Sequence, residues 1–350
     1  MRSLPFSTCF SSRDVAVDLG TANTVVSSRS GEIVLSEPSV VAADARTSEP
    51  LAAGREALEL LGRDGIAAIQ PLRHGVIADL KATEELVRHL IGKVRRSRRP
   101  PRVIAAVPTG VSAVQRRAVA QACVAAGARE ARLIAKPIAA ALGSGLPVEQ
   151  PTGSMVLDVG AGTSEVALIS MGAIVASRSI PIGGHELDAR ILTHLKREHS
   201  VLIGQQTAEQ IKIQIASASP YGQAAAIYIP ARYLGADSLR TVRLTSHDIR
   251  SALERPLAQI IEATKETLTR TPPQLACDVM DRGITLTGGG SLLHGLAERL
   301  SRETGMPTRL ADSPSTCVAI GSSRSVESQT RRSRPPSPRA IAATPAPASK

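Results

Sequence analysis

The chain has 350 residues, of which 43% are hydrophobic, which is enough for one large or two medium domains with a sizeable core. Aromatic residues make up only 1%, which argues against folds that stack nucleic-acid bases, so we expect no nucleic-acid partner. The four cysteines lie far apart without a CxxC pair, which indicates a reducing compartment and neither a disulfide framework nor a zinc site. No apolar run reaches the roughly 18 residues of a membrane span, and the first 12 residues make a poor signal peptide.

The net charge of +11 is concentrated in two clusters. The first consists of Lys93, Arg95, Arg96, Arg98, Arg99 and Arg102. The second lies in a tail rich in Pro, Ser and Ala, and consists of Arg331, Arg332, Arg334 and Arg339. Such clusters suit phosphate groups, whether on lipid or on nucleic acid. The alternative is a solvated loop followed by a disordered tail.

In chain order, short apolar runs bounded by turn residues predict alternating strands and helices up to residue 142. Strands are predicted at 14–19, 24–27, 103–107 and 132–135, and helices at 83–94, 112–126 and 138–142. Thr83 is the predicted cap of the first helix, and Ser112 opens the second. Pro137 suits the first turn of the third helix, which places Lys136 at its N-cap.

The second half of the chain repeats this strand and turn theme. Strands are predicted at 155–159, 165–170, 173–180 and 283–286, and helices at 185–199, 207–217, 246–269 and from Ser291 onward. Strands that are joined both by hairpins and by helices predict an α/β protein with mixed sheets.

One motif occurs twice, at the end of an apolar strand in each half. Asp18-Leu19-Gly20-Thr21 recurs as Asp158-Val159-Gly160-Ala161-Gly162-Thr163. Glycine lets backbone N–H groups approach a phosphate closely, and an Asp at a strand end can hold Mg²⁺ beside the phosphates. A third glycine turn, 287–291, follows a late strand and precedes a helix. Together the three turns predict a nucleotide site with its metal.

Several longer segments resemble the MreB family, the bacterial actin homologues of rod-shape determination. They are DLGTANT at 18–24, EPSVVA at 37–42, GVIAD at 75–79, GLPVEQPTGSM at 145–155, LIGQQTAEQIKIQI at 202–215 and MDRGITLTGGGSLL at 280–293. The resemblance extends from about residue 13 to residue 321. It implies the fold shared by actin, heat-shock chaperones and sugar kinases, in which two duplicated α/β halves surround a nucleotide cleft.

The resemblance also implies a division of the chain. Residues 1–12 would be a flexible segment, 13–147 the first actin-like half, and 148–314 the second. A helix at 315–325 would return to the first half, and 326–350 would be a disordered basic tail.

The resemblance implies ATP and Mg²⁺ as cofactors and assigns site residues to them. Asp18 and Asp158 would face the metal. The implied nucleotide-binding residues are Thr21, Ala22, Asn23, Gly160, Gly162, Thr163, Ser164, Glu209, Lys212, Gly288, Gly289, Gly290 and Ser291. Glu209 and Lys212, three apart on one helix face, would meet the adenosine, and the alternative for them is a surface ion pair.

The chain departs from the family pattern at three places. Lys136 stands where the family has the Glu that positions or activates the attacking water, and a protonated lysine cannot accept a proton. No catalytic residue is therefore intact, although Thr163 is a candidate to assist. The alternative for Lys136 is a side chain that extends into solvent.

The second departure is Ala161, which replaces a Gly, and its Cβ crowds the phosphates unless the residue has a negative φ. The third departure is the Arg-rich segment 93–102, which lacks an apolar tip, so membrane attachment would depend on charge and on Phe6 and Phe10.

Three functions compete. The first is an ATP-binding, filament-forming, membrane-associated cytoskeletal protein in cell-shape determination and the spatial control of cell-wall (peptidoglycan) synthesis. The second is a divergent relative that binds nucleotide without hydrolysing it and acts as a regulatory or co-polymerising subunit. The third, an enzyme or chaperone of the same fold, ranks last. For the first, the family implies self-association, inner-membrane wall-elongation proteins and an anionic membrane surface as partners, at the cytoplasmic face of the cell membrane.

Overall fold

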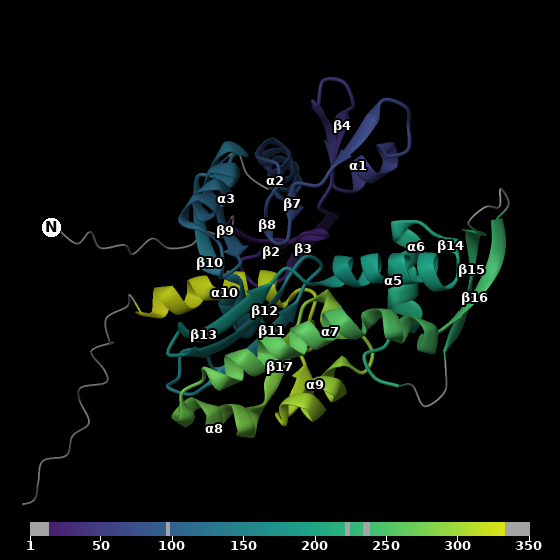
Figure 1. Cartoon of the computed structure of the whole chain (residues 1–350). Coiled ribbons are helices and arrows are strands. Elements are labelled where there is room, and N and C mark those ends of the chain that lie inside the picture. The colour runs from purple at the N-terminus through teal and green to yellow at the C-terminus, as the bar shows by residue number, and fades with distance from the viewer. Residues whose placement is uncertain (1–13, 96–98, 221–224, 234–238, 333–350) are drawn as a thin grey trace, which may run out of the picture.

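The computed structural model describes residues 14–95, 99–220, 225–233 and 239–332. Two five-stranded sheets form the centres of two lobes (Figure 1). The sheet of lobe I has the order β10-β9-β1-β2-β3. Its strands are β1 (Val15–Leu19), β2 (Asn23–Ser28), β3 (Ile33–Pro38), β9 (Arg102–Val107) and β10 (Glu130–Ala135). The sheet of lobe II has the order β13-β12-β11-β17-β18. Its strands are β11 (Ser154–Val159), β12 (Ser164–Ser170), β13 (Ala173–Ile180), β17 (Ile284–Thr287) and β18 (Thr308–Leu310).

The two sheets have the same topology. The central strand β1 pairs antiparallel with β2 on one side and parallel with β9 on the other. In lobe II, β11 pairs antiparallel with β12 and parallel with β17. The mixed sheets and the duplicated halves that the sequence predicts are therefore present.

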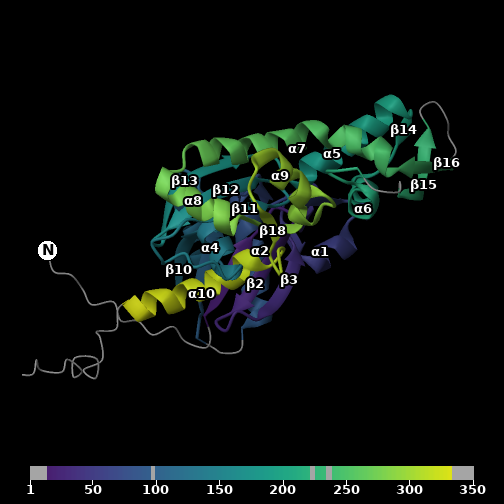
Figure 2. The ribbon, with the colours of Figure 1, turned by 90° about the horizontal axis from the view of Figure 1, so that it is seen from below.

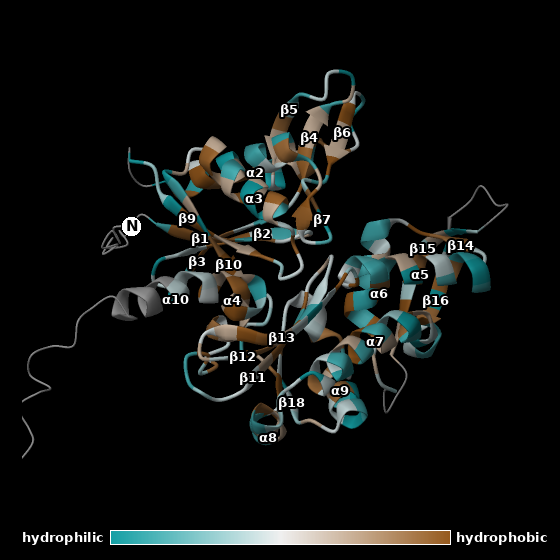
Figure 3. Cartoon of the chain, turned by 60° about the vertical axis from the view of Figure 1, so that its left-hand side comes forward, coloured by the Kyte–Doolittle hydropathy of each residue, from teal (hydrophilic) through white to brown (hydrophobic). Residues whose placement is uncertain are grey.

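Helices cover the sheets, and hydrophobic residues gather where helices and sheets meet (Figure 3). The helices of lobe I are α1 (Arg55–Leu60), α2 (Leu80–Val94), α3 (Ala113–Ala125) and α4 (Lys136–Gly143). Those of lobe II are α5 (Gly184–Glu198), α6 (Gln205–Ile215), α7 (Ser246–Thr269), α8 (Pro273–Arg282), the 3₁₀ turn η1 (Gly289–Leu292) and α9 (Leu296–Thr304). Because aromatic residues are scarce, both cores consist of Ala, Val, Ile and Leu side chains with few exceptions.

Each lobe carries a smaller sheet at its outer edge. In lobe I it comprises β5 (Pro50–Ala53), β4 (Val41–Asp44) and β6 (Ile66–Ile69), with the two-stranded β7 (Leu72–Arg73) and β8 (Val76–Ile77) nearby. In lobe II it comprises β14 (Val201–Leu202), β15 (Ala226–Tyr233) and β16 (Leu239–Thr245). These small sheets project at the top and at the right of Figure 1.

Helix α10 (Cys317–Arg332) packs against α4 and against β1 and β2 of lobe I, as the view from below shows (Figure 2). The two helices approach closely because Gly143 and Gly321 have no Cβ, which would overlap backbone atoms of the partner helix. On its other side, α4 packs its alanines against the sheet of lobe II. The first helix after β10 is therefore held between the two lobes, and so is the lysine at its beginning.

Four expectations about element ends are wrong. Asp79, and not Thr83, caps α2: its carboxylate accepts a hydrogen bond from Ala82 N, while the Thr83 hydroxyl donates to the Asp79 carbonyl oxygen. Ala135 is the N-cap of α4, so Lys136 is its first helical residue. Ser291 lies in η1, and the following helix begins only at Leu296. Helix α10 continues through residues 326–332, which were expected to be disordered, whereas residues 1–13 and 333–350 lie outside the described part of the chain.

Candidate functional site

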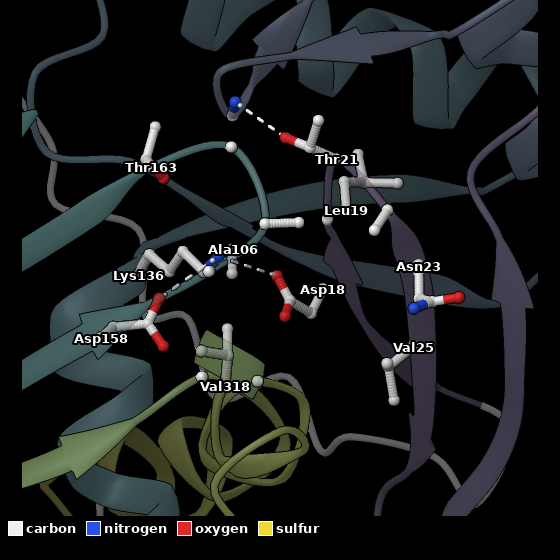
Figure 4. A pocket seen from close by; sticks show the side chains of 18 of the residues that line it. Asp18, Leu19, Thr21, Asn23, Val25, Ala106, Lys136, Asp158, Thr163 and Val318 are labelled. Atoms are coloured by element: carbon white, nitrogen blue, oxygen red, sulfur yellow. Dashed lines mark hydrogen bonds and ion pairs between the residues drawn. The ribbon is translucent and has the colours of Figure 1, made fainter. Parts of the chain in front are cut away.

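The two repeated motifs face each other across a cavity between the lobes. Asp18 ends its strand in lobe I and Asp158 ends the equivalent strand in lobe II, and each is followed by its glycine turn. The cavity is lined by residues of both turns and of the third glycine turn (Figure 4). Predicted residues in its wall are Asp18, Thr21, Ala22, Asn23, Asp158, Gly160, Gly162, Thr163, Gly288 and Gly289. The lining also includes Lys136.

Lys136 extends into this cavity and not into solvent. Its Nζ lies 3.4 Å from Asp158 Oδ2 and 3.9 Å from Asp18 Oδ1, and its side chain is only 12% exposed. The solvent-facing alternative for this lysine is therefore wrong. Burial lowers the pKa of the Lys136 ammonium, but the carboxylates of Asp18, Asp158 and Glu165 outweigh it and hold the pKa above its ordinary value. The lysine accordingly stays protonated at neutral pH.

Glu165 is a buried acid beside this cluster that the sequence reasoning missed. It pairs with Asp158 across the hairpin of lobe II, in a strand whose residues are all buried. Its Oε2 accepts a hydrogen bond from Thr109 N at 3.2 Å. Burial raises the pKa of Glu165 to about 7, although the Lys136 ammonium opposes the shift. The sequence did contain a signal for this residue. In the predicted hairpin Glu165 lies directly opposite the motif aspartate Asp158, so the two side chains must be on the same face of the sheet.

Asp18 and Asp158 have different surroundings. Asp158 Oδ1 accepts a hydrogen bond from Thr287 Oγ1 at 3.0 Å, on the neighbouring strand β17. Burial raises the pKa of Asp18, with the Lys136 ammonium lowering it and the Asp158 carboxylate adding to the rise.

The glycine turns bring backbone groups to the cavity. A Cβ on Gly162 would overlap Thr21 Oγ1 of the opposite lobe. The His74 Nδ1 and Gly162 O atoms are 3.1 Å apart, and Gly75 N donates to Thr21 Oγ1 at 3.2 Å. The two lobes therefore touch directly at the turns, where only glycine leaves enough room.

The third turn is equally close-packed on one side. Gly288 has φ +81°, and a Cβ there would lie 2.8 Å from Asp158 Oδ1. Gly289 has open space at the Cβ position and lines the cavity. Ser291 Oγ instead donates to the Gly288 carbonyl oxygen at 2.6 Å, and a Cβ on Gly290 would contact Val159.

Ala161 fits its turn without backbone strain. It is absent from the residues with positive φ in the described chain, so its conformation is one that any L-residue adopts. Its carbonyl oxygen accepts a hydrogen bond from His185 N at 2.8 Å. The departure from Gly at this position therefore leaves the turn intact.

Five predicted nucleotide residues lie outside the wall of this cavity: Gly290 and Ser291, described above, and Ser164, Glu209 and Lys212. Ser164 is buried in β12, where its hydroxyl donates to the Ile182 carbonyl oxygen at 2.7 Å. Glu209 is exposed on α6. Lys212 Nζ lies 2.9 Å from Asp188 Oδ1 and donates to the Gly184 carbonyl oxygen at 3.3 Å. The acid that pairs with Lys212 is thus on α5, and sequence reasoning missed it because only helix packing brings the two together.

Two members of the basic segment 93–102 are engaged in ion pairs. Lys93 Nζ lies 3.1 Å from carboxylate oxygens of both Glu37 and Glu56. Arg102 is buried, and its Nε lies 3.5 Å from Glu130 Oε2. The alternative of a solvated loop is therefore wrong for Arg102, whereas Lys93 is exposed beside its two glutamates, and residues 96–98 lie outside the described part of the chain.

Two lobes of one topology, with matched Asp-glycine turns on a shared cavity, define an actin-like protein. The family model described as "MreB/Mbl protein" matches residues 12–334. The cell shape-determining protein MreB of Escherichia coli K12 is 45% identical over 325 residues, covering 90% of this chain and 94% of that protein. The cell shape-determining protein Mbl of Bacillus subtilis 168 is 42% identical over 313 residues, covering 88% of this chain and 94% of that protein. The chain belongs to the MreB/Mbl family.

Solved structures agree with this assignment. The crystal structure of MreB5 of Spiroplasma citri bound to ADP superposes with a TM-score of 0.85 at 32% identity, covering 91% of this chain and 97% of that one. The same protein bound to AMPPNP gives a TM-score of 0.84 at 31% identity, with coverages of 91% and 98%.

The family resemblance implies Mg²⁺ at Asp18 and Asp158, and the residues present can be tested against it. In this chain an ammonium lies beside both carboxylates, where it would repel a dication. The site as built does not fit a resident Mg²⁺.

Proposed function

We propose that this chain binds an adenine nucleotide in the cleft between its lobes and assembles into filaments that take part in determining cell shape. The observation that carries the proposal is the convergence of three glycine turns and two strand-end aspartates on one cavity. Backbone N–H groups at such turns suit phosphate oxygens. The Spiroplasma relative crystallised with ADP and with AMPPNP supports the same use of the cleft.

Filament formation is supported by family membership and by where apolar side chains are exposed. Val114 on α3 is 78% exposed, and Tyr228 on β15 is 69% exposed. The two elements lie at opposite sides of the molecule (Figure 1). Contacts between different surfaces of successive copies generate open filaments, as head-to-tail assembly requires.

A second candidate is a family member that binds nucleotide without hydrolysing it, and Lys136 specifically favours it. The position that would hold the water-positioning Glu carries an ammonium, which has no lone pair and keeps its proton. Loss of general-base assistance typically costs 10²–10⁴-fold in rate. Such a subunit would persist in the nucleoside-triphosphate state and regulate or co-polymerise with other copies.

Membrane association remains part of the proposal. Among the described residues no helix is long and apolar enough to cross a bilayer. Arg95 and Arg99 are exposed at the end of α2 and before β9, where they suit an anionic surface. Contacts with wall-elongation proteins at the inner face of the cell membrane are proposed on family grounds alone.

One experiment tests these points together. The full chain is incubated with ATP, with AMPPNP or without nucleotide, and with vesicles of phosphatidylglycerol or of phosphatidylcholine, and then sedimented while released phosphate is measured. We expect nucleotide-dependent pelleting, greater on the anionic vesicles at low salt, with little phosphate release. Lys136→Glu should raise phosphate release at least tenfold, whereas Lys265→Glu, at a surface lysine, should not. A strict monomer under every condition would contradict filament formation.

A further inference from the structure

One ammonium and two carboxylates, from three elements that are far apart in the sequence, lie close together in the cavity. Asp18 comes from the end of β1, Asp158 from the end of β11, and Lys136 from the first residue of α4. The ammonium lies within 4 Å of one oxygen of each carboxylate. In Figure 4 both carboxylates point toward the lysine across the cavity.

The position of the ammonium is held by the fold. Proline follows Lys136 at the beginning of α4, and the helix packs three buried alanines between the lobes. Asp158 is fixed in turn, because Thr287 occupies its Oδ1 and leaves Oδ2 toward the lysine. A lysine that extended into solvent would show neither the two-sided ion pairing nor a side chain only 12% exposed.

The ammonium also lies against a phosphate-binding turn. A Cβ on Gly160 would be 3.7 Å from Lys136 Nζ, so the amine borders the second glycine turn. A lysine ammonium has three N–H donors. Two can serve the aspartates, and the third is available to a phosphate oxygen held by the turns. This is the bridging role, between protein carboxylates and phosphates, that a divalent cation performs in many nucleotide sites.

We infer that Lys136 acts as a tethered cation in place of Mg²⁺, so that this chain binds a nucleoside triphosphate without a divalent metal ion. The inference rests on the proposed nucleotide binding and specifies its cofactor requirement. It departs from the metal assignment that the family resemblance implies for Asp18 and Asp158. Because the ammonium carries one charge where Mg²⁺ carries two, the backbone donors of the glycine turns must supply more of the phosphate binding.

The test measures ATP binding to the full chain by calorimetry, in buffer with EDTA and in buffer with Mg²⁺. The natural protein should bind ATP in EDTA with a Kd within threefold of its value with Mg²⁺. Lys136→Ala vacates the space between the carboxylates, and its ATP binding should become at least tenfold tighter when Mg²⁺ is added. Lys265→Ala, whose lysine pairs with Glu303 on the surface at 3.6 Å, is the matched control and should behave as the natural protein does.

A second readout needs no nucleotide. Mn²⁺ alone, followed by its electron paramagnetic resonance signal, should find no tight site in the natural protein. If Lys136→Ala folds, as circular dichroism would establish, it should gain one site per chain. A tight Mn²⁺ site in the natural protein, or ATP binding to it that appears only with Mg²⁺, overturns the inference and leaves the proposed nucleotide binding standing. No ATP binding in either buffer overturns both.

Discussion

The two hairpins of the duplicated motif have the same backbone arrangement but differ in the charge of the residue opposite the aspartate. In lobe I, Asp18 pairs across the hairpin with the apolar Val25, and its side chain is 12% exposed. In lobe II, Asp158 pairs with the acid Glu165, and its side chain is 2% exposed. The ammonium of Lys136 lies nearer to Asp158. Duplication of the fold therefore preserved the turn geometry, while the charge that must be compensated is concentrated in the second lobe.

The largest expected effect on stability comes from replacing the aspartate of each hairpin with alanine, one at a time. Asp158→Ala leaves Lys136 and the Thr287 hydroxyl without their closest partner in a buried site, and breaking a buried pair in this way costs about 3–5 kcal/mol. Asp18→Ala removes a more distant and more exposed partner and should cost less. Urea denaturation of both variants measures the difference.

Asp158→Asn is the control, because it keeps an acceptor for Thr287 and the side-chain shape. It should recover part of the lost stability. A larger loss for Asp18→Ala than for Asp158→Ala would show that the ammonium is held mainly by lobe I, contrary to the comparison.

Glu165, the additional buried acid of lobe II, predicts how the free energy of unfolding depends on pH. The pKa of Glu165 is about 7 in the folded state, above its ordinary value of 4.5, so the folded protein binds more protons between these values. The free energy of unfolding should therefore fall as the pH rises from about 4.5 to about 7, by at most about 3 kcal/mol from this group. Asp18, whose pKa is also raised, contributes in the same direction.

Glu165→Gln should flatten this decline, because glutamine does not ionise. Glu209→Gln, at an exposed glutamate on α6, is the matched control and should leave the pH dependence unchanged. Denaturation curves at several pH values between 4.5 and 8 provide the comparison. An equal slope in natural and Glu165→Gln proteins would mean that Glu165 is ionised at low cost.

The smallest expected effect concerns two glycines of the second turn. One is in contact with the opposite lobe and the other only with its own turn, so their substitutions compare the two kinds of contact. Gly162→Ala would drive a Cβ into Thr21 of the opposite lobe and should cost about 1–3 kcal/mol, as overpacking typically does. Gly160→Ala meets the Thr163 carbonyl oxygen at 3.3 Å, within its own turn, and should cost less. Thermal unfolding of the two variants measures the difference. A larger cost for Gly160→Ala would indicate that the turns matter mainly within their own lobe.

Much of this architecture follows from local sequence. The strands β1, β2, β11, β12 and β13 were predictable because apolar residues in short runs end at glycine turns, and both signals act over a few residues. The helix α7 was predicted with its observed ends, and in the structure Thr245 and Asp248 form a capping box at its beginning. By contrast, β15 and β16 were not predicted. β15 contains Pro230, and the two strands pair with each other in antiparallel register from Ala226 to Thr245.

The repeated motif alone placed both aspartates and the glycine turns at a common site, because duplicated strand ends meet across the lobes. What the sequence could not decide was the destination of three charged side chains. Lys136 pairs with Asp18 and Asp158, from which 118 and 22 residues of the chain separate it. Glu165 is buried beside Asp158, and Lys212 pairs with Asp188. A long flexible side chain can reach solvent or a partner equally well by local rules. The packing of α4 between the lobes, which brings two carboxylates within reach, decides this for Lys136, and the packing of α5 against α6 decides it for Lys212.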